Sequence, residues 1–250
     1  MSGRVLITGA AGLIGGILRR ELADRYDLTA LDATRRRGLL RTDMRKLDSI
    51  LDAFAHQDVV VDLAADPSPG ASWKTVYENN LAAAYNAFEA SHRSGVRRLV
   101  FASSNHVTGL YEHDHPYSEI VEGEYGSLDP AAIPLIDAAA PIRPDGLYAI
   151  GKAFGEALGR YYAEEHGLSV ICLRIGTVNA ANRPQSARQF ATLLTHADLV
   201  RLVRSAIEAP ESVRFAVVYG VSNNTWRFWD LEEARATLGY VPEDDAESWR

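Results

Sequence analysis

The stretch Arg4-Val-Leu-Ile-Thr-Gly9-Ala-Ala-Gly12-Leu-Ile-Gly15 decides the fold class of this chain of 250 residues. Its first five residues form an apolar run that stops at a glycine. Apolar side chains at helical spacing follow, at Leu13, Ile17, Leu18 and Leu22. This pattern predicts a strand, a tight turn and a helix. Glycines in such a turn let the backbone approach a pyrophosphate at the positive N-terminus of the helix.

The remaining sequence continues the alternation of strand and helix. Strands are predicted at 26–31, 59–64, 98–102, 169–175 and 215–219, and helices at 47–55, 73–94, 147–166 and 197–209. Strands that alternate with helices indicate βαβ units with right-handed crossovers. We therefore expect an α/β fold with a doubly wound parallel sheet, Rossmann-like, and a small C-terminal substrate-binding portion.

We divide the chain into a dinucleotide-binding domain over residues 1–178 and a smaller portion over residues 179–250. Residues 107–143 interrupt the first part, because they are rich in Pro, Asp, Glu and Tyr and show no clear period. A long aperiodic segment is either a lid-like insertion or a solvent-exposed excursion.

Asp32 lies 17 residues after Gly15, at the end of the second predicted strand. A carboxylate there accepts hydrogen bonds from the adenosine ribose hydroxyls and repels a ribose 2′-phosphate. Arg35, Arg36 and Arg37 would attract that phosphate, but they lie farther into the loop, where they can point to solvent. We therefore expect NAD as the cofactor. A glycine-rich turn in a protein without a cofactor is the alternative.

Tyr148 and Lys152 stand four residues apart at the start of a predicted helix and so share one face. An ammonium beside a phenol, together with a positive nicotinamide ring, favours the phenolate, which can act as a general base. Ser104 follows the strand over residues 99–103 and is placed to orient a substrate hydroxyl. Taken alone, the Tyr and Lys are also consistent with an amphipathic surface pair.

Composition excludes several functions. With 26 Lys and Arg against 33 Asp and Glu, the net charge of −7 offers no electrostatic footprint for nucleic acid. No apolar run reaches the length of a membrane span, and no signal peptide begins the sequence, so we expect a cytoplasmic protein that binds no membrane. Cys172 is the single cysteine and cannot form an intramolecular disulfide. His113, Asp114 and His115 lack the spacing of metal ligands, so we expect no metal.

The motifs together resemble the extended short-chain dehydrogenase/reductase superfamily of NAD-dependent epimerases and dehydratases. Within it, the sequence is most similar to uronate dehydrogenases and to short-chain NAD-dependent glucose-6-phosphate dehydrogenases. The similarity covers nearly the whole chain, and Asn105-His106 after the two serines is its most discriminating feature. Its other carrying segments are residues 101–109, 143–148, 173–176, 229–230 and 238–240.

The resemblance implies a reaction and roles for particular residues. Tyr148, with Lys152 and Ser104 as its catalytic partners, would take the proton of the C1 hydroxyl of a cyclic anionic sugar, and the product would be a lactone. The implied substrate-binding residues are Ser68, Asn105, His106, Thr177 and Arg188, of which Arg188 would hold the anionic group at C6. The implied cofactor-binding residues are Gly9, Gly12, Leu13, Ile14, Gly15, Asp32, Asp43, Met44, Leu63, Ala64, Ala65, Asn80, Tyr148, Lys152 and Ile175.

Several functions stay open at this point. The sugar is expected to be a uronate such as glucuronate or galacturonate, with glucose 6-phosphate as the alternative under the same mechanism. A nucleotide-sugar epimerase or dehydratase is a further alternative, as is a non-catalytic NAD-binding protein. The resemblance also implies a homo-oligomer, a dimer or higher, paired through the helices at 73–94 and 147–166.

Overall fold

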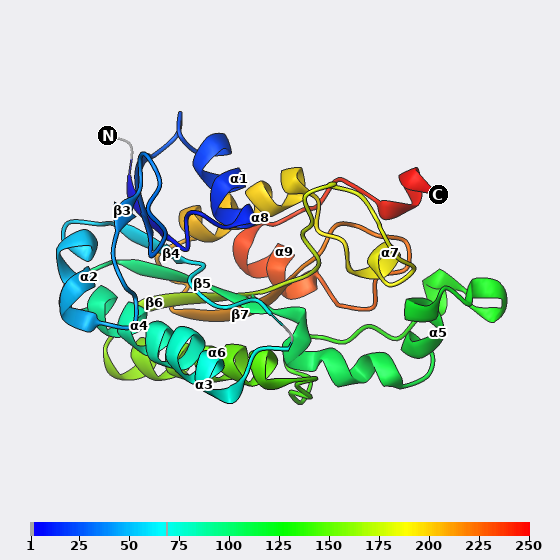
Figure 1. The fold of residues 1–250 in the computed structure, drawn as a ribbon. Helices are drawn as coiled ribbons and strands as arrows, with labels where there is room; N and C mark the ends of the chain where they lie inside the picture. The colour runs from blue at the N-terminus through cyan, green and yellow to red at the C-terminus, as the bar shows by residue number, and fades with distance from the viewer. Residues whose placement is uncertain (1–2, 69) are drawn as a thin grey trace.

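A seven-stranded parallel sheet forms the centre of the molecule (Figure 1), in a computed structural model that describes residues 3–68 and 70–250. The strands run in the order β3-β2-β1-β4-β5-β6-β7. Their bounds are β1 Arg4–Thr8, β2 Asp27–Asp32, β3 Leu40–Arg41, β4 Val59–Asp62, β5 Arg98–Ser104, β6 Ser169–Ile175 and β7 Phe215–Gly220. The order reverses at β1, as in doubly wound folds. The predicted fold class is confirmed, although the sequence pattern did not indicate the two-residue strand β3.

Helices cover both faces of the sheet. Their bounds are α1 Leu13–Glu21, α2 Leu47–Phe54, α3 Trp73–Val76, α4 Ala83–Arg93, α5 Tyr117–Glu122, α6 Leu147–Glu165, α7 Gln189–Thr192, α8 His196–Glu208 and α9 Glu232–Leu238. One apolar core lies between the sheet and α1, α8 and α9, and a second lies between the sheet and α2, α4 and α6. The central strands are buried on both sides, which explains their unbroken apolar sequences. Within the described residues, no helix is long and apolar enough to cross a bilayer.

The predicted helix over residues 73–94 contains a π-helical segment. Residues Tyr77–Ala82 form π turns between α3 and α4, and the backbone stays right-handed throughout. Asn80 lies in this segment, where its amide donates to the Asp66 carbonyl at 3.1 Å and accepts from the Asp66 amide at 2.8 Å. The wider turns therefore coincide with a side chain that fixes the loop after β4.

The insertion over residues 107–143 is folded and packed, so the alternative of a solvent-exposed excursion is wrong. It contains the 3₁₀ segments Asn105–His113, Tyr125–Ser127 and Pro130–Ala132 as well as α5. Tyr117, Ile120 and Ile136 are buried in the same core as α8 and α9. The backbone of Ile136 also exchanges hydrogen bonds with Phe228 and Asp230, at 2.7 and 2.9 Å. The segment is thereby fixed against the C-terminal part of the chain.

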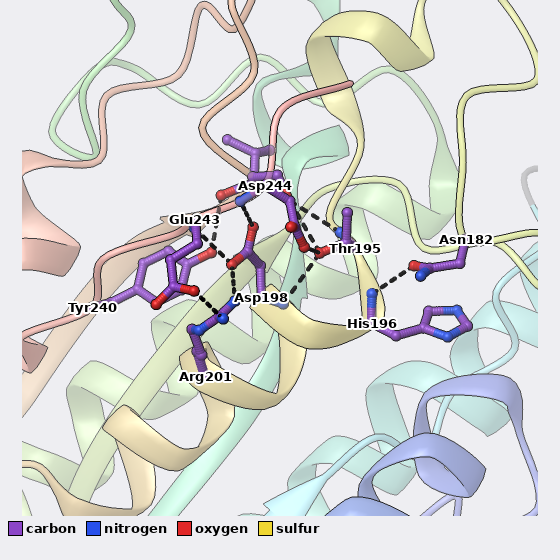
Figure 2. A network of polar contacts seen from close by, with 10 residues as sticks. Asn182, Thr195, His196, Asp198, Arg201, Tyr240, Glu243 and Asp244 are labelled. Carbon is purple, nitrogen blue, oxygen red and sulfur yellow. Dashed lines mark hydrogen bonds and ion pairs between the residues drawn. The ribbon is translucent and has the colours of Figure 1, made fainter. Parts of the chain in front are cut away.

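The C-terminal part completes the sheet with β7 and places α8 beside α1. Figure 2 shows how its last segment is held. The buried carboxylate of Asp198 accepts the backbone amides of Glu243 and Asp244 at 2.9 and 3.1 Å and pairs with Arg201 at 2.7 Å. These contacts anchor the chain after α9 to the start of α8. The predicted division at residue 178 stays a prediction.

Candidate active site

A cavity of about 710 Å³ opens at the carboxyl ends of the parallel strands. Ligands bind at this edge in doubly wound folds, where the strand order reverses. Its lining begins at the glycine turn after β1, passes the ends of β4, β5 and β6, and reaches the loop before α7. The cavity therefore joins the predicted cofactor turn to the predicted catalytic residues.

The glycine turn leaves room for a ligand backbone because side chains are excluded from it. Gly9 has φ of +61°, and a Cβ there would stand 2.8 Å from the Leu63 backbone. A Cβ on Gly15 would stand 2.7 Å from the Cα of Ala10. Helix α1 begins at Leu13 with its unpaired amides facing this cradle. The turn thus fits the pyrophosphate of a dinucleotide.

Asp32, at the end of β2, holds the glycine turn by a hydrogen bond to its backbone. Its Oδ2 accepts the Ala11 amide at 2.9 Å, and its Oδ1 accepts the Thr34 amide at 2.7 Å. Arg36 Nη1 donates to the Ala11 carbonyl at 3.1 Å, so this arginine lies against the turn instead of pointing away into solvent as expected. The ribose end of the cavity therefore carries a carboxylate and, at its rim, a guanidinium.

Most of the predicted cofactor residues line the cavity. They are Gly9, Gly12, Leu13, Ile14, Gly15, Asp32, Leu63, Ala65, Tyr148, Lys152 and Ile175. The other four, which do not line it, are Asp43, Met44, Ala64 and Asn80. The Asp43 carboxylate pairs with Arg45 at 2.8 Å, and the Met44 side chain is buried in the core under α2.

Ser104, Tyr148 and Lys152 all line the central part of the cavity. Ser104 and Lys152 are buried, and the Lys152 Nζ lies 5.6 Å from the centre of the Tyr148 ring. The Ser104 Oγ accepts the backbone amide of His106 at 3.2 Å and donates to Asn105 Oδ1 over a long 3.4 Å, a hydrogen bond that a closer ligand oxygen can replace. A hydroxyl, a phenol and an ammonium therefore line the same cavity, and these are the groups that proton transfer from an alcohol requires.

A buried ion pair holds α6, the helix that carries Tyr148 and Lys152. Glu156 lies one turn after Lys152, and its two oxygens accept from Arg174 on β6, each at 2.9 Å. Ser103, next to Ser104, donates to Glu156 at 2.6 Å. Burial lowers the pKa of Arg174, but the hydrogen bonds and negative charge of Glu156 outweigh it and raise the pKa above its ordinary value. These hydrogen bonds fix α6 to β5 and β6.

Asn105 and His106 face the part of the cavity beyond the catalytic residues. The Asn105 Nδ2 is buried and has no hydrogen-bond partner within residues 3–68 and 70–250. His106 Nδ1 lies 2.5 Å from Asp145 Oδ2, which fixes the ring and leaves Nε2 as its other hydrogen-bonding atom. Sequence reasoning missed Asp145, although its position three residues before Tyr148 is a signal for it. Gly109 makes room for this carboxylate, since a Cβ there would stand 2.1 Å from Asp145 Oδ2.

Arg188 lines the cavity as expected, but its charge is already matched. Its Nε and Nη2 donate to the two oxygens of Glu112, at 2.6 and 2.7 Å, and its Nη1 donates to Thr177 Oγ1 at 3.3 Å. The predicted role of Arg188 toward an anionic group of the substrate stays a prediction. Sequence reasoning missed Glu112, which stands 76 residues from its partner and carries no local signal. Thr177 lines the cavity, whereas Ser68 is exposed and does not.

The described residues contain no group of three or more His, Cys, Asp or Glu side chains that could hold a metal ion. Of His113, Asp114 and His115, which the sequence analysis considered as metal ligands, two have other partners. Asp114 pairs with Arg143, and His115 Nδ1 lies 2.5 Å from Glu119. The hydrogen bond from His115 is the main cause that lowers the pKa of Glu119 to about 2.

Comparison with known proteins identifies the family. Residues 5–209 match the model of the NAD dependent epimerase/dehydratase family. The chain belongs to this family. L-arabinose 1-dehydrogenase (NAD(P)(+)) of Haloferax volcanii is 37% identical to it, over 97% of both chains. NAD-dependent glucose-6-phosphate dehydrogenase of the same organism is 32% identical, over 97% of this chain and 94% of the relative.

Solved structures of the family show the same architecture. A mutant uronate dehydrogenase from Agrobacterium tumefaciens complexed with NAD superposes with a TM-score of 0.84 at 29% identity, over 99% of this chain and 87% of the other. These findings confirm the predicted superfamily, the cofactor NAD and the prediction of an enzyme. The chain is an NAD-dependent enzyme whose relatives include sugar dehydrogenases.

Proposed function

We propose that the chain oxidises the C1 hydroxyl of a cyclic aldose to the lactone, with NAD as oxidant. The observation that carries this proposal is that Ser104, Tyr148 and Lys152 line the same cavity as the glycine turn. The sugar dehydrogenases among the relatives support the same reaction. Sequence reasoning favours a uronate, with glucose 6-phosphate as the alternative, and that choice depends on Arg188.

Each residue has a defined part in the proposed reaction. NAD, when bound, would supply the acceptor for the hydride that leaves C1. The Tyr148 oxygen takes the proton of the C1 hydroxyl, and the Lys152 ammonium favours the phenolate form that does so. The Ser104 hydroxyl donates to the same substrate oxygen and holds it against Tyr148. Loss of a hydride and a proton from C1 and its hydroxyl leaves a C1 carbonyl, which in a cyclic aldose is a lactone.

The far part of the cavity suits a sugar because it presents several polar groups. The buried Asn105 amide lacks a partner among the described residues, and a buried donor left unpaired is unfavourable. A sugar hydroxyl oxygen would accept from it. His106 Nε2 and the Thr177 hydroxyl supply further groups of the same kind. Convergent polar groups in an otherwise enclosed cavity are typical of a specific ligand site.

NADH formation measured by absorbance tests the proposal. The panel contains glucose, arabinose, glucuronate, galacturonate and glucose 6-phosphate, each with NAD. We expect turnover of at least one aldose, and we expect Tyr148→Phe to lower kcat by about a hundredfold or more while NADH binds as before. Conversion of a UDP-sugar without any net NADH would instead favour the epimerase alternative. Unchanged turnover in Tyr148→Phe would contradict the mechanism.

We also propose a homo-oligomer. The support is a set of exposed aromatic and aliphatic side chains on the surface of α3, α4, α6 and the π-helical segment, namely Trp73, Tyr77, Tyr85, Ile150 and Tyr161. Large exposed apolar groups that lie close together are typical of interfaces. Light scattering coupled to size exclusion would measure the mass, and a strictly monomeric protein would contradict the proposal.

A further inference from the structure

The ion pair between Arg188 and Glu112 lies at the end of the cavity that the cofactor does not need. The glycine turn and Asp32 occupy one end, Ser104 and Tyr148 the middle, and Thr177, Arg188 and Gln189 the other end. Among the described lining residues, the basic side chains are Lys152, His106 and Arg188. Lys152 adjoins Tyr148, and His106 contacts the Asp145 carboxylate. An anionic group on the sugar would therefore depend on Arg188.

Glu112 occupies the edge of Arg188 that binds carboxylates best. The Nε and Nη2 atoms form a planar fork that matches two carboxylate oxygens, and Glu112 fills it with contacts of 2.6 and 2.7 Å. The pair is largely shielded from water, because the side chain of Glu112 is 13% exposed and that of Arg188 27% exposed. A second carboxylate or a phosphate at Arg188 would have to use its other N–H groups and would be repelled by the negative charge of Glu112 on the same guanidinium. Shielding from water makes that repulsion stronger.

Both partners are held in place by the fold. Glu112 stands in the 3₁₀ segment Asn105–His113, which directly follows the catalytic Ser104. Arg188 precedes α7, and the Tyr125 hydroxyl of the insertion donates to the carbonyl of the neighbouring Ala187 at 3.5 Å. The insertion therefore carries the carboxylate and also packs against the loop that carries the guanidinium. Arg188 lines the cavity, and Glu112, which is not among the lining residues, acts on a ligand through its pair with Arg188.

We infer that Glu112 is a specificity-determining residue, which neutralises Arg188 so that the cavity takes an uncharged aldose and excludes uronates and sugar phosphates. This inference rests on the proposed function for the reaction, and it names the class of substrate. The N–H groups of Arg188 outside the fork still suit the hydroxyl oxygens of a neutral sugar. The selection works by repulsion of the wrong ligand as much as by attraction of the right one.

Binding measurements test the inference without the need for turnover. Titration calorimetry of the NADH complex with glucuronate and with glucose gives a ratio of affinities for each variant. In the unaltered protein, glucose should bind more tightly than glucuronate. Glu112→Gln and Glu112→Ala free the fork, so we expect the ratio to shift toward glucuronate by about ten- to a hundredfold, the range of a charged hydrogen bond.

Two further variants control this experiment. Asp114→Asn removes a negative charge two residues away, from a carboxylate that pairs with Arg143 and not with Arg188, and should leave the ratio unchanged. Adding Arg188→Gln to Glu112→Gln should abolish the shift of the affinity ratio toward glucuronate. Tighter binding of glucuronate than of glucose by the unaltered protein would overturn the inference, as would an unchanged ratio in both Glu112 variants.

Failure of the proposed function would look different. If no aldose yields NADH while the binding ratio still shifts in the Glu112 variants, the reaction is wrong and the role of Glu112 stands. If aldoses are oxidised and glucuronate or glucose 6-phosphate is the preferred substrate of the unaltered enzyme, the reaction stands and the role of Glu112 is wrong.

Discussion

Replacing Gly109 with alanine would move a carboxylate that the cavity needs. The added Cβ would stand 2.1 Å from Asp145 Oδ2 and 2.5 Å from its Cγ, whereas ordinary contacts begin near 3.4 Å. Asp145 must therefore retreat by more than an ångström. His106 Nδ1 now lies 2.5 Å from that oxygen, so the retreat breaks the contact or turns the imidazole with it. Either result turns the His106 Nε2 atom away from the proposed sugar site.

The size of the effect follows from the bond that is lost. A hydrogen bond to a charged group contributes about 1.5 to 3 kcal/mol, and each 1.4 kcal/mol is about a tenfold change in rate or affinity. We expect Gly109→Ala to lower kcat/KM for the aldose by about ten- to a hundredfold. Overpacking should also lower the free energy of unfolding by about 1 to 3 kcal/mol. Affinity for NADH should not change, since the glycine turn lies elsewhere in the cavity.

The assay compares kcat/KM for the best aldose of the panel with NADH affinity from a fluorescence titration. Gly126→Ala is the matched control, because a Cβ there meets nothing within 4 Å and the residue belongs to the same insertion. In a protein that already carries Asp145→Ala, Gly109→Ala should lower kcat/KM much less, since the carboxylate is gone and only the Cβ of residue 145, 2.9 Å away, is left to move. An equal loss of kcat/KM on adding Gly109→Ala to the unaltered protein and to Asp145→Ala would refute the argument. An unchanged kcat/KM in Gly109→Ala would refute it as well.

Three other predictions concern cofactor choice and stability. Arg36→Ala should lower kcat/KM with NADP by about tenfold and that with NAD by much less, measured side by side, because a guanidinium at the turn favours a 2′-phosphate. Glu156→Gln leaves Arg174 buried without its charged partner, so the free energy of unfolding should fall by about 3 to 5 kcal/mol. Urea denaturation measures this loss, and an unchanged midpoint would contradict a stabilising role of the ion pair. Asp198→Asn removes a carboxylate that accepts two backbone amides, so the free energy of unfolding should fall by about 1 to 3 kcal/mol. Calorimetry should show this as a lower Tm, and turnover should be retained.

Local patterns predict the fold well in this chain. The strand, glycine turn and helix over residues 4–21 follow from nearby residues alone, and the buried strands are visible as unbroken apolar runs. The strand β3 has only two residues, Leu40 and Arg41, which is too short for any periodicity. The π turns at Tyr77–Ala82 change the backbone and leave the apolar spacing nearly intact, so the pattern over residues 73–94 indicates one ordinary helix.

The candidate site is predictable where its residues have a motif and unpredictable where they meet through the fold. Ser104, Tyr148 and Lys152 follow from their spacing and from the strands and helix that carry them. The partner of Arg188 does not, because Glu112 lies in an aperiodic insertion whose path only the packing of Tyr117 and Ile120 determines. A sequence shows that an arginine is present; the charge it offers to a ligand depends on neighbours that tertiary structure supplies.

The π turns between α3 and α4 also affect how this chain is expected to align with its relatives. One residue more than an α-helix needs turns every later side chain by about 100° around the helix axis. Without that residue, Asn80 would point to another side and release the loop at Asp66 that borders the cavity. Such turns are rare and are frequently found at functional sites. We therefore expect relatives without these turns to lack one residue here, so that an alignment with them places a single gap within residues 77–82.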